Sequence, residues 1–248
     1  MTDMGWIGRV RAAASRGRWA PWPAGPAQER WRKTAWAAAG WLAALPVLLL
    51  PISDPDLWWH LSSGRWMAEH LRWPRAEWLS FTLQGRPWAD FEWLGQLVFH
   101  GAFSLGGLGA LWALKTALLG CVAWLLWRLL QGLSAPARAA GLAFWAACMI
   151  PRSDLRIELF SCAAFAALLL GLERIRTGTE IKNERAAAAA AAVFALWANI
   201  HSGFAAGLLL LGLYAAGEAH GILRGDAVAR RRAALLSLSL GTGALGAL

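Results

Sequence analysis

Long runs of apolar residues are the feature that most limits what this chain can fold into. The run Thr34–Ile52 is 19 residues long and carries no charge, close to the ~20 residues that an α-helix needs to cross about 30 Å of hydrocarbon. A second long run, Leu105–Leu130, is interrupted only by Lys115 and Arg128. Only 16% of all residues are charged, against about 25% in soluble domains. The sequence therefore indicates a membrane protein and not a water-soluble globular enzyme.

Five further apolar segments follow. Four of them are 14 to 17 residues long, which is short for a membrane span, so re-entrant or buried core helices are alternatives to spans. These four are Ala137–Ile150, Ile157–Leu172, Ala186–Ile200 and Gly203–Ala219. The fifth begins near Ala233, and the chain stops within it at Leu248. The expected fold is all-α: a polytopic transmembrane helix bundle over residues 34–248.

The basic residues are divided unevenly between the predicted loops. Residues 1–33 hold seven basic residues and three prolines without apolar periodicity, which predicts a disordered basic tail. If this tail is cytoplasmic and the segments alternate, seventeen basic residues lie on the inner side and six on the outer side. Inner loops of membrane proteins carry such an excess, so we expect a cytoplasmic N-terminus. Because the basic residues flank the segments and do not form one groove, we expect no nucleic-acid partner despite the net charge of +9.

The three cysteines show no ligand or disulfide pattern. Cys121, Cys148 and Cys162 lie within apolar runs, with no CxxC or Cys/His spacing. Neither a disulfide framework nor a zinc site is indicated. We expect these cysteines to be small buried apolar residues.

The first predicted outer loop, Ser53–Trp93, is longer than a simple connection requires. Its 41 residues contain six of the 15 acidic residues and seven of the 18 tryptophans. Helical spacing places Asp56 and His60 on one face of a helix with apolar residues beside them. We therefore expect two interfacial helices in this loop, near Leu57–Leu71 and Phe91–Phe103, that lie in the membrane plane. Tryptophan favours the membrane–water boundary, and sugar stacking is the alternative role.

Several short motifs together resemble a known family. The loop begins Asp54-Pro55-Asp56-Leu57-Trp58-Trp59-His60 and continues with Pro74-Arg75, Ser80-Phe81-Thr82, Gly85-Arg86-Pro87-Trp88, Asp90 and Glu92-Trp93-Leu94. Later runs are Glu158-Leu159-Phe160-Ser161 and Trp197-Ala198-Asn199-Ile200-His201-Ser202-Gly203-Phe204. With these motifs the chain resembles the polytopic bacterial membrane proteins of the GT-C glycosyltransferase type, relatives of the dolichyl-phosphate-mannose mannosyltransferase superfamily. The resemblance covers about residues 34–218.

The resemblance implies a site at the start of the first outer loop. In that family an acidic pair beside two membrane-parallel helices supplies a general base or, in some members, a ligand of a divalent metal. By motif the pair is Asp54 and Asp56, and because Pro55 separates them, either acid is a candidate. Capping of the following helix is the structural alternative. The resemblance also implies a bacterial plasma membrane location and a chain that is the N-terminal part of a longer protein.

The chemistry of sugar transfer from a lipid phosphate indicates further candidate residues. A carboxylate must take a proton from the acceptor hydroxyl, and cations must bind the departing phosphate. Asp54 and Asp56 are the catalytic candidates. The candidate substrate-binding residues are His60, Asp90, Glu92, Lys115, Arg152, Arg156, Glu158, Asn199 and His201. Structural roles are the alternatives: ion pairs among the charged residues near Arg152, packing for His60, and stabilisation of a turn by Asn199 and His201.

Three functions follow from these observations. The favoured one is an integral membrane glycosyltransferase that moves a sugar from a polyprenyl-phosphate donor to an acceptor on the outer membrane face. The second is a transporter or lipid-handling protein in which Lys115 and Glu158 are charges on the transport pathway. The third is a noncatalytic membrane scaffold. The long, acidic and aromatic outer loop favours the transferase.

Overall fold

The described part of the chain is built from helices and the loops that join them. The computed structural model describes residues 25–177 and 183–246, and no strand is formed within these ranges. Its α-helices are α2 (Pro26–Leu49), α3 (Asp56–His70), α4 (Trp93–Leu129), α5 (Ala135–Met149), α6 (Glu158–Thr177), α7 (Asn183–Ile200), α8 (Phe204–Gly217), α9 (Ala219–Leu223) and α10 (Ala227–Gly246). The all-α fold expected from the sequence is confirmed.

The first described helix begins earlier than the sequence predicts. Proline is favoured in the first helical turn, where its missing N–H leaves no hydrogen bond unmade, and α2 begins at Pro26. Glu29 adds a negative charge near the positive end of the helix dipole. The helix therefore includes residues 26–33, for which the prediction of a disordered tail is wrong. The rest of the predicted tail, residues 1–24, lies outside the described residues.

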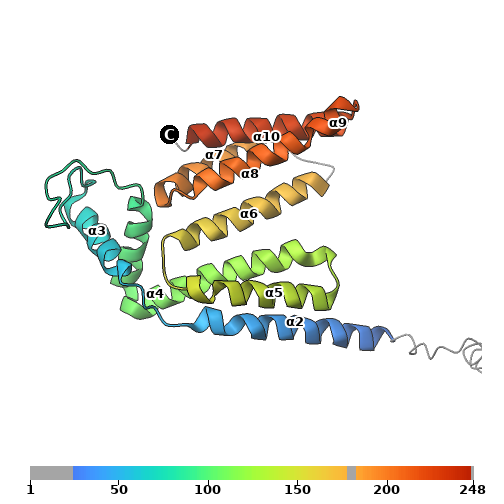
Figure 1. The fold of residues 1–248 in the computed structure, drawn as a ribbon, viewed down its shortest axis with the longest axis horizontal. Coiled ribbons are helices and arrows are strands. Elements are labelled where there is room, and N and C mark those ends of the chain that lie inside the picture. Colours follow the sequence, from blue (N-terminus) through green and yellow to red (C-terminus); the bar gives the residue numbers. More distant parts are fainter. Residues whose placement is uncertain (1–24, 178–182, 247–248) are drawn as a thin grey trace, which may run out of the picture.

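Two glycines divide α4 into a part beside α3 and a part within the bundle. Gly106 and Gly107 have non-helical backbone angles, and the φ of Gly107 is 59°, a value that costs glycine little because it has no Cβ. The part before the kink corresponds to the predicted interfacial helix Phe91–Phe103. It packs against α3 at one end of the molecule, across the direction of the other helices (Figure 1). The part after the kink corresponds to the predicted second span.

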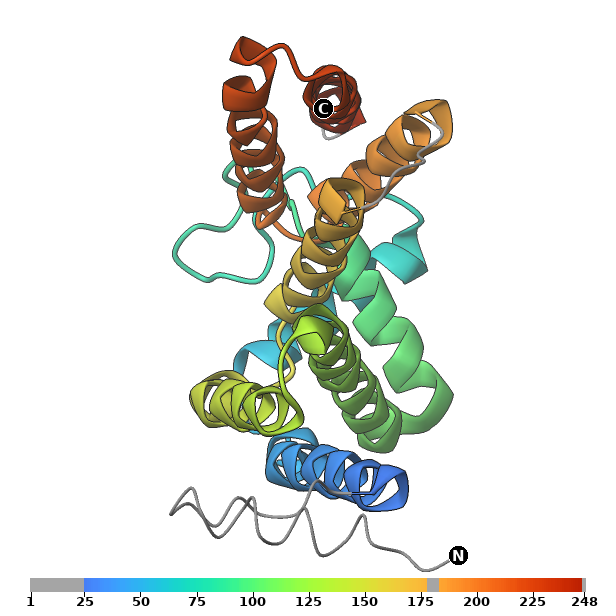
Figure 2. The same cartoon turned by 90° about the vertical axis from the view of Figure 1, so that its right-hand side faces the viewer.

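Two groups of buried apolar residues hold the helices together. One lies among α2, α4, α5 and the start of α6 and includes Leu142 and Leu159. The other lies among α6, α7, α8 and α10 and includes Leu172 and Phe194. Because α6 contributes to both groups, it joins the two halves of the bundle, as its central position shows (Figure 2).

Apolar side chains also cover much of the outside of the bundle. The segments Trp93–Gly132 and Phe204–Leu223 are long and apolar enough to cross a membrane, and only 33% and 11% of their most apolar windows are buried. A core helix of a soluble protein would be mostly buried. On α8, for example, Leu209 and Leu213 are exposed. All three cysteines are likewise exposed, so the expectation that they are buried is wrong.

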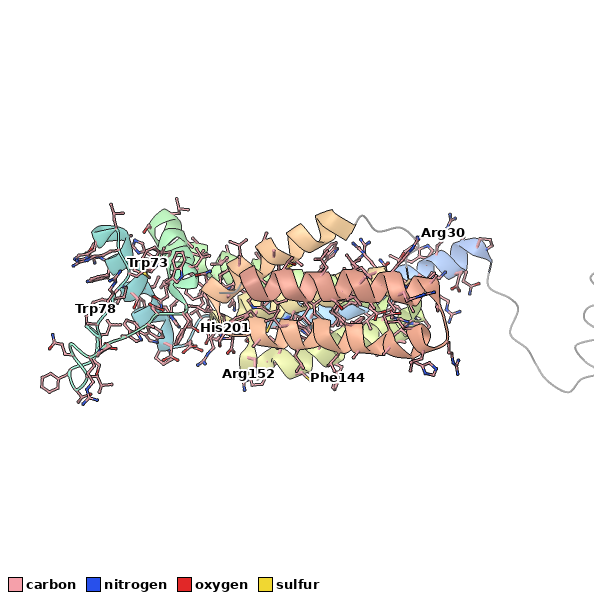
Figure 3. The ribbon with its side chains drawn as sticks, turned by 90° about the horizontal axis from the view of Figure 1, so that it is seen from above. Arg30, Trp73, Trp78, Phe144, Arg152 and His201 are labelled. Carbon is pink, nitrogen blue, oxygen red and sulfur yellow. The ribbon has the colours of Figure 1, made fainter. Side chains whose placement is uncertain are left out.

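The helices alternate in direction, so the loops gather at two ends (Figure 1). We call one end the acidic end; it consists of residues 50–92, 150–158 and 199–203. The other we call the basic end; it consists of the start of α2, the α4–α5 and α8–α10 connections, and the C-terminal turns of α6. Arg152 and His201 lie toward the acidic end and Arg30 lies at the basic end (Figure 3). This alternation matches the loop assignment made from the charge distribution.

Candidate functional site

Most of the candidate residues come together at the acidic end. They come from four segments that are far apart in the sequence: the α2–α3 connection with α3, the start of α4, the loop before α6, and the α7–α8 turn. The contacts between these segments determine which of the predicted residues have a structural partner.

The acidic pair at the start of α3 is linked to the loop before α6. The Asp54 carboxylate, whose side chain is only 2% exposed, forms an ion pair with Nε of Arg156. Its Oδ1 accepts a hydrogen bond of 3.0 Å from the backbone N–H of Asp56. Asp56 is 55% exposed, with its Oδ2 3.8 Å from a terminal nitrogen of Arg156. Asp54 thus has the predicted structural contact at the helix start, and it also holds an arginine.

A second contact joins the same two segments. The carboxylate of Asp154 accepts hydrogen bonds from the backbone N–H of Ser53, at 3.1 and 3.0 Å, and from its hydroxyl, at 2.6 Å. Sequence reasoning did not select Asp154 as a site residue, because its partner lies 101 positions away. Arg152 and Glu158 form the expected ion pair nearby, at 3.8 Å, with the arginine largely exposed.

Glu92 lies between two histidines from different segments. Its Oε2 is 4.0 Å from Nδ1 of His60 on α3, and its Oε1 is 3.8 Å from Nε2 of His201 in the α7–α8 turn. Burial raises the pKa of Glu92, and the negative charges of Asp90 and Glu158 add to this effect. Burial lowers the pKa of His60 to about 4 and also lowers the pKa of His201. At neutral pH both imidazoles are therefore uncharged.

Hydrogen bonds fix the orientation of the His201 ring. Its Nδ1 lies 3.0 Å from the backbone N–H of Gly203, which can only donate, and 2.9 Å from the hydroxyl of Ser161. Trp197 donates its indole N–H to the same hydroxyl at 2.7 Å. Because Nδ1 accepts, the proton of the neutral ring lies on Nε2, which faces Glu92. Sequence reasoning missed Ser161 and Trp197, although Trp197 stands four residues before His201, the spacing of one helix turn.

Asp90 and Asn199 have mainly structural contacts. Oδ1 of Asp90 accepts hydrogen bonds from the backbone N–H of Glu92 and from the side-chain amide of Gln96, both at 3.0 Å. Burial raises the pKa of Asp90. Oδ1 of Asn199 accepts a hydrogen bond of 2.8 Å from the indole of Trp93. These contacts fix the chain that leads into α4 and attach the first turn of α4 to the end of α7, which holds Glu92 in place.

Lys115 does not lie in this cluster. Its amine donates a hydrogen bond to the backbone carbonyl of Leu50, and the neighbouring Thr116 donates one of 3.0 Å to the carbonyl of Leu48. The last carbonyls of a helix have no partner within the helix, and a cation there also interacts favourably with the helix dipole. The structure therefore gives Lys115 a capping contact at the end of α2 in place of the predicted contact with a phosphate.

The described residues do not fit the divalent metal that the resemblance allows. Among residues 25–177 and 183–246, no three His, Cys, Asp or Glu side chains are arranged to hold a metal ion. The oxygen of Asp54 that could face such an ion is paired with Arg156.

No protein-family model, curated protein or solved structure matches this chain. The function is therefore inferred from the arrangement of side chains at the acidic end and from the apolar exterior of the bundle.

Proposed function

We propose that the chain is a polytopic membrane glycosyltransferase of the GT-C type, with its active site at the acidic end. In this proposal the acidic end lies on the outer face of the bacterial plasma membrane. The N-terminus is cytoplasmic, and the enzyme transfers a sugar from a polyprenyl-phosphate donor to an acceptor hydroxyl. The observation that carries the proposal is the convergence of carboxylates, imidazoles and an arginine from four distant segments at one end of a largely apolar bundle.

The exterior of the bundle supports a membrane location. In the two segments that can span a membrane, only 33% and 11% of the most apolar windows are buried inside the protein. Uncovered apolar surface is unfavourable in water and favourable in hydrocarbon. The basic end carries arginines such as Arg138, Arg174 and Arg231, as expected for a cytoplasmic side. The crosswise direction of α3 and of the first part of α4 is that of helices lying along the membrane surface (Figure 1).

Arg156 supports the choice of a phosphate-linked donor. The ion pair with buried Asp54 fixes its Nε, while the arginine side chain as a whole remains 45% exposed. A guanidinium group can bind a phosphate through two parallel hydrogen bonds. In this position it would stabilise the negative charge that develops on the departing lipid phosphate. Arg152, held more loosely by Glu158, lies on the same loop.

No observation favours the transporter alternative. A transport pathway through the bundle would use Lys115 and Glu158 as charges along one route. Lys115 instead contacts the end of α2 and Glu158 lies near Arg152.

The proposal is tested by donor turnover in proteoliposomes that contain the full chain. The probes are undecaprenyl-phosphate mannose and undecaprenyl-phosphate glucose, and the measurement is release of undecaprenyl phosphate. We expect turnover by the parent protein and a loss on the order of 10²–10³-fold in Arg156→Gln. Arg65→Gln is the matched control, because Arg65 is an exposed arginine of α3, at the same end of the bundle, that pairs only with Glu69, at 2.7 Å, among the contacts of the described residues. Equal rates in both variants and the parent would contradict the role of Arg156, and a parent that turns over neither probe would contradict the transferase proposal.

A further inference from the structure

Glu92 is a partly buried carboxylate of the acidic end that lies between two histidines. Within the described residues its side chain accepts no hydrogen bond, and its two oxygens face imidazole nitrogens at 3.8 and 4.0 Å. Its side chain is 26% exposed. By contrast, Asp54 is occupied by Arg156 and by the backbone of Asp56, and Asp154 is occupied by Ser53.

We infer that Glu92, and not Asp54 or Asp56, is the catalytic base that takes the proton from the acceptor hydroxyl. This inference rests on the proposed function and names the residue that the sequence pattern did not select for this role. Asp54 and Asp56 become positioning residues that hold Arg156. Glu92 was expected only to bind substrate.

Glu92 is held in position from two sides, as a catalytic base requires. On one side, α3 is pressed against α4 so closely that a Cβ on Gly64 would lie 2.3 Å from the backbone oxygen of Gln96. This close packing places His60, whose Nδ1 is buried without a hydrogen-bond partner, beside the Glu92 carboxylate. On the other side, the hydrogen bonds from Gly203 and Ser161 turn the Nε2–H of His201 toward it. A base held by rigid elements needs little reorganisation during the reaction.

The charges that face Glu92 suit a base that works near neutral pH. Asp90 on its own segment and Glu158 on α6 are acidic, while His60 on α3 and His201 after α7 are neutral at that pH. Burial and the two acids raise the pKa of Glu92 above its usual value. A carboxylate with a raised pKa accepts a proton more readily, provided that it is still ionised at the working pH.

The proposed step is a displacement at the anomeric carbon of the sugar. The acceptor oxygen forms a bond to the anomeric carbon of the sugar as its proton passes to the Glu92 carboxylate. The bond between the anomeric carbon and the phosphate oxygen breaks, and its electron pair stays on the phosphate. Arg156 interacts with the resulting charge. No oxidant, reductant or other co-reactant is needed.

The test compares three variants of the full chain in proteoliposomes with the two undecaprenyl-phosphate sugars. We expect Glu92→Gln to lose about 10²–10⁴-fold in kcat, the usual effect of removing a general base. Asp56→Asn should lose less than about 10-fold, because Asp56 only supports Arg156. Glu69→Gln, the same substitution as Glu92→Gln at an exposed position of α3, should keep the parental rate. The inference is wrong if Glu92→Gln keeps the parental rate, or if Asp56→Asn shows the larger loss.

A second measurement separates chemistry from folding. Glu92→Ala should regain part of its activity when formate is added, because a small carboxylate can enter the space left by the side chain and accept the proton. A purely structural role for Glu92 predicts no such recovery, and the Glu69→Ala control should not respond to formate. Failure of the inference is distinguishable from failure of the proposed function, since only the latter leaves the parent protein inactive with both donors.

Discussion

The two ends of the bundle differ in how their most buried charges are paired. At the acidic end, partners come from distant segments: Ser53 binds Asp154, which lies 101 positions away, and buried Asp54 pairs with Arg156. At the basic end some pairs are local, as between Arg176 and Glu173, three residues apart at 2.7 Å, although Arg232 also lies 4.0 Å from Glu218 and Tyr214 donates a hydrogen bond to Glu173. The first kind of contact can form only after the whole bundle has folded. The second kind can form on a single helix.

This difference separates a site from a charged surface. Burying a charge costs several kcal/mol unless a partner compensates for it, and such arrangements concentrate at functional sites. Exposed local pairs contribute about 0–1 kcal/mol and need no precise geometry. The basic end suits a solvated cytoplasmic face, where the number of basic residues matters more than their positions. The acidic end suits a catalytic site, where the positions of the charged groups relative to one another determine the chemistry.

The largest expected effect on stability concerns His60 and pH. Because its pKa falls from 6.5 to about 4 on folding, the unfolded chain binds more protons between these values. The free energy of unfolding should therefore fall as the pH is lowered from 6.5 to 4, by up to roughly 3 kcal/mol from this group. The raised pKa values of Asp90 and Glu92 act in the opposite direction, since there the folded state binds more protons. Thermal unfolding in nanodiscs across this pH range measures the sum.

His60→Gln isolates the contribution of the histidine. In this variant the loss of stability between pH 6.5 and 4 should be smaller than in the parent. An unchanged pH dependence would mean that the imidazole is not buried as described, and that the acidic end resembles the basic end more than we propose.

A smaller effect is expected from a methyl group at the α3–α4 contact. In Gly64→Ala the new Cβ would lie 2.3 Å from the Gln96 carbonyl oxygen and 2.8 Å from the Cβ of His100. Overpacking of this kind costs about 1–3 kcal/mol, so the unfolding temperature should fall. Gly101→Ala is the control on the neighbouring helix, because its Cβ would meet nothing within 4 Å. Equal unfolding temperatures for the two variants would show that α3 and α4 are not packed this closely.

The smallest effect is expected at the basic end. Glu29 lies 3.7 Å from both Arg32 and Lys33, and all three side chains are exposed. Glu29→Gln should change the free energy of unfolding by less than about 1 kcal/mol, as is usual for exposed pairs. A chemical denaturation curve is sufficient to measure this. A change as large as that of Gly64→Ala would remove the distinction between the two ends.

Sequence reasoning was most successful where the signal is local. Apolar runs predicted most of the helices, and the separate ranges Phe91–Phe103 and Leu105–Leu130 divided α4 just before the observed kink at Gly106 and Gly107. It was less successful for contacts across the fold. The bond between Ser53 and Asp154, and the placement of Lys115 against the end of α2, depend on which helices become neighbours. Periodicity within a segment carries no information about that choice.

The exposed cysteines show a further limit of the sequence signal. An apolar helix that faces lipid and one that faces a protein core have the same composition, so burial was predicted for Cys121, Cys148 and Cys162, which lie on the outside of the bundle. The same ambiguity applies to the shorter helices. Only the arrangement of all the helices shows which faces are left uncovered.

The most direct test of the account is the position of the two ends relative to the membrane. Single cysteines are introduced as Glu77→Cys at the acidic end and Glu29→Cys at the basic end, with Cys121, Cys148 and Cys162 replaced by alanine. The full chain is then labelled in bacterial cells with a membrane-impermeant maleimide. We expect residue 77 to be labelled in intact cells and residue 29 only after permeabilisation. Labelling of both positions to the same extent in intact cells, or of residue 77 only after permeabilisation, would contradict the account.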